Sequence, residues 1–128
     1  MPDALRRILV VEDHDDSRSV LVMLLQVWGY EVDDAATGRE AFEKARTGWP
    51  DIVLLDLNLP DWSGYDVARA LRTLPGGRPF VIAVSGYDSI ADRVRAAEVG
   101  CDVFLLKPGI DELERLLADP TVGRQRTG

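Results

Sequence analysis

Residues 51–56 read DIVLLD, and the chain continues as LNLP to position 60. Four consecutive apolar residues, Ile52 to Leu55, are typical of a strand that is buried on both faces, as in a parallel sheet. The run ends at Asp56, and a carboxylate there is costly to bury unless a cation or hydrogen-bond donors surround it. The stretch therefore predicts a central strand that delivers an ionised side chain to a site at its end.

Similar short apolar runs occur elsewhere in the chain, and stretches with helical spacing of apolar residues separate them. The predicted strands are 7–12 (RILVVE), 51–56, 79–85 (PFVIAVS), 102–107 (DVFLLK) and a charged, edge-type strand at 31–36 (EVDDAA). Helix starts are indicated by the pairs Thr37 with Glu40, Ser63 with Asp66 and Ser89 with Asp92, and helix ends by Gly29, Gly48 and Gly100. The last helix is expected at about 110–118.

The strict alternation of strands and helices predicts an α/β fold with an open, doubly wound parallel sheet and right-handed crossovers. A length of 128 residues suits one domain. The net charge of -7 disfavours direct binding to nucleic acid. One cysteine, no signal-peptide pattern in the first twenty residues and no membrane-length apolar run favour a cytoplasmic protein.

Polar residues stand at the predicted carboxyl ends of the strands, where sheets of this kind bind ligands. They are Glu12 and Asp13, then Asp56, Ser85 and Lys107. Carboxylates a few ångströms apart repel by about 4 kcal/mol per pair at an effective dielectric near 20, so a cation is expected among them. Oxygen ligands favour Mg²⁺, with Mn²⁺ as the alternative. The Ser85 hydroxyl and Lys107 ammonium suit a phosphoryl group, which makes Asp56 a candidate carboxylate nucleophile.

The motifs VVEDHDD, LLDLNLPDWSGYD, AVSG and FLLKP resemble those of the receiver domains of two-component response regulators, including chemotaxis regulators. The resemblance extends from about residue 7 to residue 118. It implies a flavodoxin-like (βα)5 fold with strand order 2-1-3-4-5. The receiver domain is predicted at 1–118, and the turn-forming residues of the segment 119–128 (DPTVGRQRTG) predict a flexible tail.

The resemblance further implies a role for each site residue. The implied cation ligands are Glu12, Asp13, Asp56 and the backbone carbonyl of Asn58. Asp56 would accept phosphate from a sensor histidine kinase or a phosphotransfer protein, and Ser85 and Lys107 would contact the phosphoryl oxygens. Phe104 holds the place of the family's switch aromatic, which turns inward when Ser85 moves toward the phosphate. Asn58 and Tyr87 would tune the lifetime of the phosphate.

Simpler interpretations compete with several of these roles. Glu12 and Asp13 could stabilise the positive end of the first helix, Ser85 could cap a helix, and Phe104 could be a core residue. His14, a single histidine in an acidic loop, is interpreted as solvated.

Three functions compete at the level of the whole chain. The first is a signalling domain that catalyses its own phosphotransfer and slow dephosphorylation without turning over small substrates. The second is a phosphatase of the haloacid dehalogenase type, which needs an acid where Asn58 stands, and the third is an interaction module that is never phosphorylated. Residues after 118 are too few for an output domain, so the chain is either a stand-alone receiver or part of a longer protein.

Overall fold

A computed structural model describes residues 6–47, 49–75, 78–86, 89–107, 109–119 and 122. These residues form a single parallel sheet of five strands in the order β2-β1-β3-β4-β5, with a helix after each strand. The strands are β1 (Arg7–Val11), β2 (Glu31–Ala35), β3 (Ile52–Asp56), β4 (Phe80–Ser85) and β5 (Val103–Leu106). The helices are α1 (Asp15–Val27), α2 (Gly38–Arg46), α3 (Gly64–Leu71), α4 (Ile90–Glu98) and α5 (Ile110–Ala118). The predicted fold class, strand order and edge position of β2 are confirmed.

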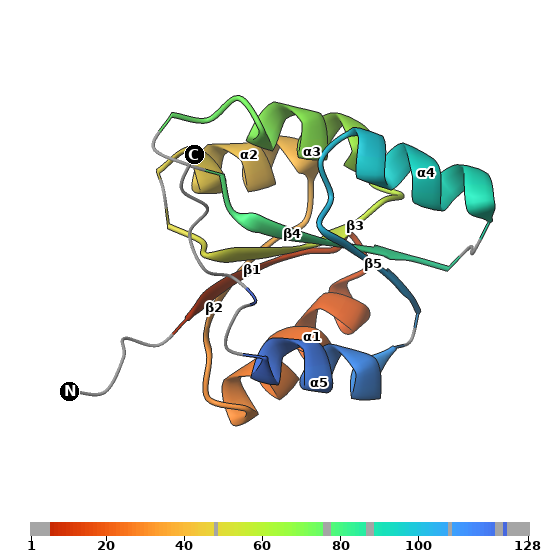
Figure 1. Cartoon of the computed structure of the whole chain (residues 1–128). Coiled ribbons are helices and arrows are strands. Elements are labelled where there is room, and N and C mark those ends of the chain that lie inside the picture. The colour runs from red at the N-terminus through yellow and green to blue at the C-terminus, as the bar shows by residue number, and fades with distance from the viewer. Residues whose placement is uncertain are drawn as a thin grey trace.

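Helices cover both faces of the sheet, which explains the uninterrupted apolar run of β3. Helices α2, α3 and α4 pack on one face, and α1 and α5 pack on the other (Figure 1). Val53 and Leu55 belong to the core cluster on the first face, whereas Ile52 and Leu54 belong to the cluster on the second. Because successive strand side chains point to opposite faces, a strand between two helical layers needs apolar residues at every position.

The helix boundaries follow the capping signals of the sequence. Thr37, Ser63 and Ser89 are the N-caps of α2, α3 and α4, and each side chain accepts a hydrogen bond from the backbone N–H three residues on. Gly29 and Gly100 have positive φ angles of 99° and 100° just after α1 and α4, a conformation that glycine adopts without strain. The predicted helix end at Gly48 lies outside the described residues.

The predicted carboxyl ends of the strands are one residue too long at β1, β2 and β5. Glu12 and Lys107 therefore lie in the loops directly after β1 and β5, while Asp56 and Ser85 are the last residues of β3 and β4. All four side chains still come from the carboxyl edge of the sheet. In the described part of the chain, no helix has the length and apolar character that crossing a membrane requires.

Beyond α5, Val122 is buried and packs in the same core cluster as Leu113 and Leu117. Its backbone N–H donates to the carbonyl of Asp119 at 3.1 Å. Residues 120, 121 and 123–128 lie outside the described residues, so the proposed flexible tail from 119 stays a prediction.

Candidate functional site

Asp56 lies at the carboxyl end of β3 with only 5% of its surface exposed. Its Oδ1 accepts a hydrogen bond from the backbone N–H of Asn58 at 2.8 Å, and its Oδ2 accepts one from Nζ of Lys107 at 3.0 Å. The carboxylate is thus buried with a cation and a backbone donor as partners, as the cost of burying a charge requires.

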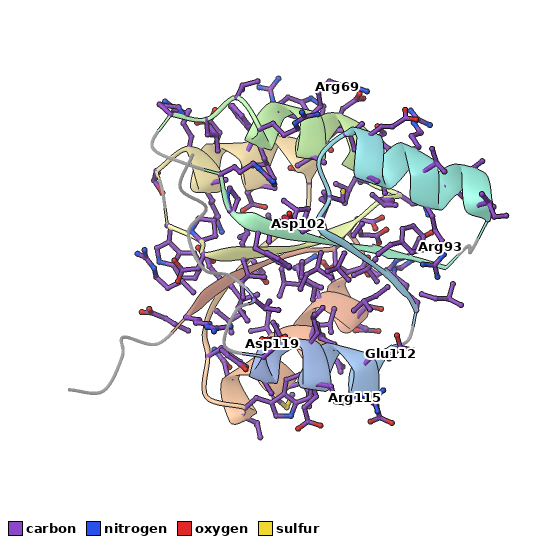
Figure 2. All side chains as sticks on the ribbon, viewed as in Figure 1. Arg69, Arg93, Asp102, Glu112, Arg115 and Asp119 are labelled. Carbon is purple, nitrogen blue, oxygen red and sulfur yellow. The ribbon has the colours of Figure 1, made fainter. Side chains whose placement is uncertain are left out.

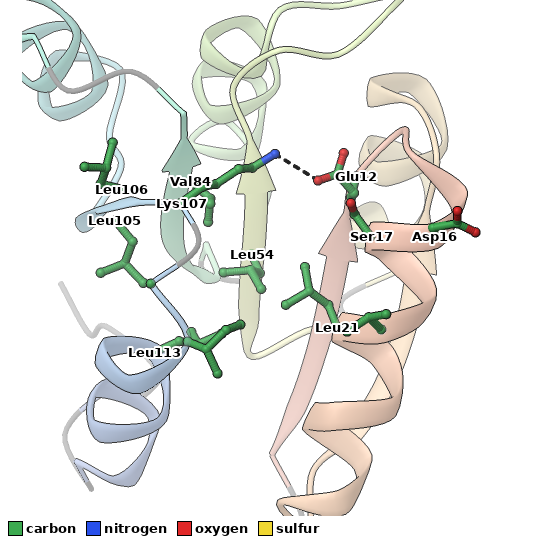
Figure 3. A pocket seen from close by; sticks show the side chains of 13 residues that line it. Glu12, Asp16, Ser17, Leu21, Leu54, Val84, Leu105, Leu106, Lys107 and Leu113 are labelled. Atoms are coloured by element: carbon green, nitrogen blue, oxygen red, sulfur yellow. Dashed lines mark hydrogen bonds and ion pairs between the residues drawn. The ribbon is translucent and has the colours of Figure 1, made fainter.

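Glu12 is the second buried carboxylate of the site, with 2% of its surface exposed. Its Oε1 accepts from the same Lys107 Nζ at 3.0 Å, and its Oε2 accepts from the backbone N–H of His14 at 3.2 Å. Helix α1 begins at Asp15, so Glu12 does not lie in its first turn. The alternative of simple helix-end stabilisation therefore does not explain where Glu12 points, which is toward Lys107 (Figure 3).

Ligand atoms of Glu12, Asp13 and His14 lie within 4.8 Å of one another. The His14 imidazole is exposed, and its Nδ1 lies 3.6 Å from Oε2 of Glu12. Asp56 is not part of this group of ligand atoms, but it shares the Lys107 ammonium with Glu12. When all are ionised, the carboxylates of Glu12, Asp13 and Asp56 and the Lys107 ammonium leave two negative charges. A hard divalent cation fits this balance and this set of oxygen donors.

Burial and mutual repulsion separate the acidities of the two buried carboxyls. Burial raises the pKa of Asp56 from its usual 3.8, and the Glu12 carboxyl adds to the rise, while the Asn58 N–H and Lys107 oppose it. Burial alone would also raise the pKa of Glu12, but hydrogen bonding with Asp56, Lys107 and the His14 N–H lowers it from 4.5 to about 2. Glu12 is therefore the more acidic of the two buried carboxyls.

Ser85 is buried at the end of β4, beside β3. Its carbonyl accepts from the backbone N–H of Lys107 at 2.8 Å, which ties the two predicted phosphoryl contacts together. Helix α4 is capped by Ser89, so the alternative in which Ser85 caps a helix is wrong.

Phe104 is half-buried on β5 and packs against the core cluster that α2, α3 and α4 cover. The Arg93 guanidinium of α4 lies 4.7 Å from the centroid of its ring. Asn58 is exposed next to the Asp56 carboxylate, whereas Tyr87 lies outside the described residues. The switch role of Phe104 and the lifetime roles of Asn58 and Tyr87 stay predictions.

The family model for the response regulator receiver domain matches residues 8–118. The chain belongs to this family. A curated relative, the transcriptional regulatory protein PrrA of Mycobacterium tuberculosis, is 39% identical over 102 residues, which cover 80% of this chain and 43% of PrrA. The chain thus spans less than half the length of such relatives.

Two solved structures, a receiver domain and a response regulator, are similar to this chain. The receiver domain of the sensor histidine kinase PA1611 of Pseudomonas aeruginosa has magnesium coordinated in its active-site cleft. It is 33% identical, with a TM-score of 0.81, and the match covers 89% of this chain and 95% of that one. A Burkholderia pseudomallei response regulator with a phosphorylated aspartic acid and a calcium ion is 30% identical, with a TM-score of 0.77 and coverage of 84% and 63%.

Two residues that support the site were missed by the sequence analysis. Arg18 of α1 donates to the backbone carbonyl of Glu12 at 3.0 Å. Gly64 approaches the acceptor strand so closely that a Cβ atom there would lie 2.6 Å from the carbonyl oxygen of Asp56. The Ser63 capping signal predicts a helix that starts at Gly64. It does not predict that Gly64 approaches the Asp56 carbonyl, because no sequence signal marks that contact.

A cavity of about 430 Å³ lies between α1 and α5 of this receiver and reaches the Asp56 edge of the sheet (Figure 3). Its walls are mainly apolar, with Glu12 and Lys107 at one end. The lining residues include Val20 and Leu21 of α1, Leu54 of β3, and Ile110 and Leu113 of α5.

Proposed function

We propose that this receiver accepts a phosphoryl group on Asp56 from a phosphohistidine of a sensor histidine kinase or a phosphotransfer protein. The observation that carries the proposal is the environment of Asp56. Its buried carboxylate lies at the carboxyl edge of the sheet with Lys107 at 3.0 Å and a second buried carboxylate, Glu12, on the same ammonium. Two carboxylates share one ammonium here, so the site carries excess negative charge. It also contains a hydrogen-bond donor, Lys107, that can contact the oxygens of an incoming phosphoryl group.

The transfer itself needs little covalent chemistry from the protein. A carboxylate oxygen of Asp56 attacks the phosphorus, the new P–O bond forms as the P–N bond to the donor imidazole breaks, and that imidazole nitrogen is protonated from solvent. Lys107 donates to the phosphoryl oxygens, and the Ser85 hydroxyl is placed to do the same from the end of β4. Catalysis then consists mainly of orientation and charge neutralisation.

We further propose that the carboxylates of Glu12, Asp13 and Asp56 and the backbone carbonyl of Asn58 hold Mg²⁺, with Mn²⁺ as a substitute. Held by these residues, the ion would supply neutralisation of charge on the phosphoryl oxygens. The two uncompensated negative charges of the site and its oxygen donors support this assignment. His14, whose imidazole borders the cluster, is not included because hard Mg²⁺ prefers oxygen.

The phosphatase alternative is disfavoured by the residue at position 58. Protonation of an alkoxide leaving group requires a general acid, and the exposed side chain of Asn58 is an amide that cannot supply a proton. A phosphohistidine donor has a nitrogen leaving group that does not need such an acid. The site therefore suits self-phosphorylation and slow self-hydrolysis, not turnover of small phosphate esters.

The domain bounds, the cellular setting and the kind of output partner are proposed from the receiver family and from the composition of the chain. We propose a receiver unit at 1–118, a cytoplasmic setting, and output through protein partners without direct contact to nucleic acid, because the chain carries a net charge of -7. Relatives such as PrrA are longer than this chain. Whether the receiver acts alone or within a longer protein is decided by its genomic context.

Incubation with acetyl phosphate and Mg²⁺ tests the proposal. We expect one acid-stable, base-labile acyl phosphate in the intact-mass spectrum and its complete loss in Asp56→Asn. Asp51→Asn is a matched control, since Asp51 precedes the opposite end of the same strand and its carboxylate accepts from the Arg7 N–H. Full labelling of Asp56→Asn would overturn the proposal, and so would an unlabelled wild-type chain that is folded and binds Mg²⁺.

A further inference from the structure

The Arg18 guanidinium contacts three segments around the acidic pair. Its Nη1 donates to the backbone carbonyl of Glu12 at 3.0 Å, and its Nε donates to Oδ2 of Asp34 at 3.1 Å. Its Nη2 donates to Oδ1 of Asp15 at 2.7 Å. Although it is a charged residue on a surface helix, the Arg18 side chain is only 17% exposed. The guanidinium therefore joins the end of β1, the start of α1 and the end of β2.

These contacts restrain the peptide units around Glu12 from both sides. The backbone N–H of Glu12 donates to the carbonyl of Ala35 at 3.1 Å, and Ala35 is the last residue of β2. The carbonyl of Glu12, which precedes Asp13, is held by Arg18. Arg18 is in turn anchored on Asp34, the neighbour of Ala35 in β2. Two connections thus attach the turn with both carboxylates to β2. One is the Glu12 N–H bond to Ala35, and the other is the Arg18 bridge to Asp34.

We propose that Arg18 is a positioning residue that fixes the Glu12–Asp13 turn in the conformation that binds Mg²⁺. The inference rests on the proposed function, because it concerns the same cation site. Groups that orient metal ligands without touching the metal commonly contribute about 10- to 100-fold to affinity. Here the oriented unit is the peptide between Glu12 and Asp13, which sets the directions of both side chains.

The shape of the contacts explains why an arginine is needed. Three acceptors surround three different nitrogens of one planar group, so the rigid guanidinium fork satisfies all of them at once. A lysine at position 18 would keep the charge, but its single nitrogen at the end of a flexible stem cannot bridge the same three segments. Arg18→Lys therefore separates geometry from charge.

The sign of the effect distinguishes positioning from electrostatics. A cation beside an acidic site repels Mg²⁺, so if Arg18 acted only through its charge, Arg18→Ala would strengthen Mg²⁺ binding and Arg18→Lys would leave it unchanged. If Arg18 positions the turn, both variants weaken binding. The two mechanisms thus predict opposite signs for Arg18→Ala.

Calorimetric titration with Mg²⁺ alone measures this directly, without any phosphodonor. We expect the dissociation constant to rise roughly tenfold in Arg18→Lys and at least as much in Arg18→Ala. Arg46→Ala is the control, since Arg46 is an exposed helical arginine that pairs with Glu43 away from the site. A circular dichroism melt of each variant without Mg²⁺ establishes that it is folded at the titration temperature.

A second pair of variants keeps the experiment decisive if Arg18→Ala does not fold. Asp34→Asn and Asp15→Asn remove the same charge, but Asp34 anchors Arg18 on β2, whereas the Asp15 side chain is 85% exposed. We expect the larger loss of Mg²⁺ affinity in Asp34→Asn. Unchanged or tighter binding in Arg18→Lys, with equal effects of the two aspartate variants, would overturn the positioning role. A folded wild-type protein that binds no Mg²⁺ would instead overturn the proposed cation site.

Discussion

The Lys107 ammonium lies 3.0 Å from Oδ2 of Asp56, a contact between residues 51 positions apart in the chain. The lysine side chain is 38% exposed, whereas the aspartate side chain is 5% exposed. Lys107 thus extends from a partly exposed position to neutralise a buried charge. Parallel β3 and β5, separated by β4, bring the two residues to the same edge.

Replacing Lys107 tests its role in the transfer. We expect Lys107→Gln to lower the rate of phosphorylation by acetyl phosphate roughly 100-fold, the usual cost of losing one preorganised donor to a developing charge. Mg²⁺ affinity should stay the same or rise, because a cation has been removed from the acidic site. Intact-mass kinetics and Mg²⁺ calorimetry measure the two quantities.

The sequence supplies a natural control, since its other lysine is Lys44. Lys44 also pairs with carboxylates, but these belong to Asp33 of β2 and Glu40 of α2. Lys44→Gln should phosphorylate at the wild-type rate. Equal losses in both lysine variants would point to a general effect of charge and would contradict the role of Lys107.

The pKa values of the two buried carboxyls predict opposite effects on stability without Mg²⁺. The pKa of Glu12 is lowered from 4.5 to about 2, so ionised Glu12 stabilises the fold above pH 4.5, and this contribution is lost as the pH falls toward 2. The pKa of Asp56 is raised above 3.8, so its ionisation destabilises the fold as the pH rises past that value. At pH 7, Glu12→Gln should therefore lower the melting temperature and Asp56→Asn should raise it.

The same comparison at low pH provides the check. At about pH 3, Asp56 is mostly protonated in both the folded and the unfolded chain, so Asp56→Asn should lose its advantage there. Calorimetric melts in a chelating buffer at both pH values measure the differences. An equal gain from Asp56→Asn at pH 3 and pH 7 would show that packing, not charge, is responsible.

The fold was predictable because its signals are local. The apolar run at Ile52 to Leu55, the cap at Thr37 and the glycine at position 29 each indicate an element without reference to any other segment. Glu12, Asp56, Ser85 and Lys107 were predictable as site candidates because each stands at the carboxyl end of a strand or directly after it. Arg18 and Gly64 escaped prediction because the contacts that connect them to the site are with the backbone carbonyls of Glu12 and Asp56, and a backbone atom leaves no pattern in the sequence.

Gly64 gives a prediction about the backbone of the acceptor strand. A methyl group at this position would lie 2.6 Å from the Asp56 carbonyl oxygen and closer still to Cα of Leu57, so the loop after β3 must shift. We expect Gly64→Ala to destabilise the protein by about 2 kcal/mol, as overpacking commonly does. Urea denaturation measures the loss. Gly86→Ala is the control, because a Cβ there meets no atom within 4 Å; a neutral Gly64→Ala would contradict the close approach.

The contact of Arg93 with Phe104 gives a prediction about signal output. It concerns how phosphorylation of Asp56 would change the surface formed by α4 and β5. Arg93 lies on α4 on the side that faces the sheet, whereas Arg69 of α3 points outward (Figure 2). The Arg93 guanidinium lies over the Phe104 ring at 4.7 Å, a contact that contributes about 0.5–2 kcal/mol in proteins. Any rearrangement of Phe104 must therefore change the contact between β5 and α4.

We expect beryllofluoride with Mg²⁺ to change amide hydrogen exchange in α4 and β5 as well as around Asp56, because the mimic adds negative charge beside Ser85. Arg93→Gln should weaken the contact between α4 and Phe104 of β5. Amide exchange in α4 and β5 should then be faster without beryllofluoride and should change less when beryllofluoride binds. Arg69→Gln, which removes an exposed arginine paired with Asp66 on α3, should behave as wild type. If beryllofluoride alters only residues near 12–13 and 56–58 in the wild type, Phe104 is a core residue and not a switch, and the output surface must lie elsewhere than α4 and β5.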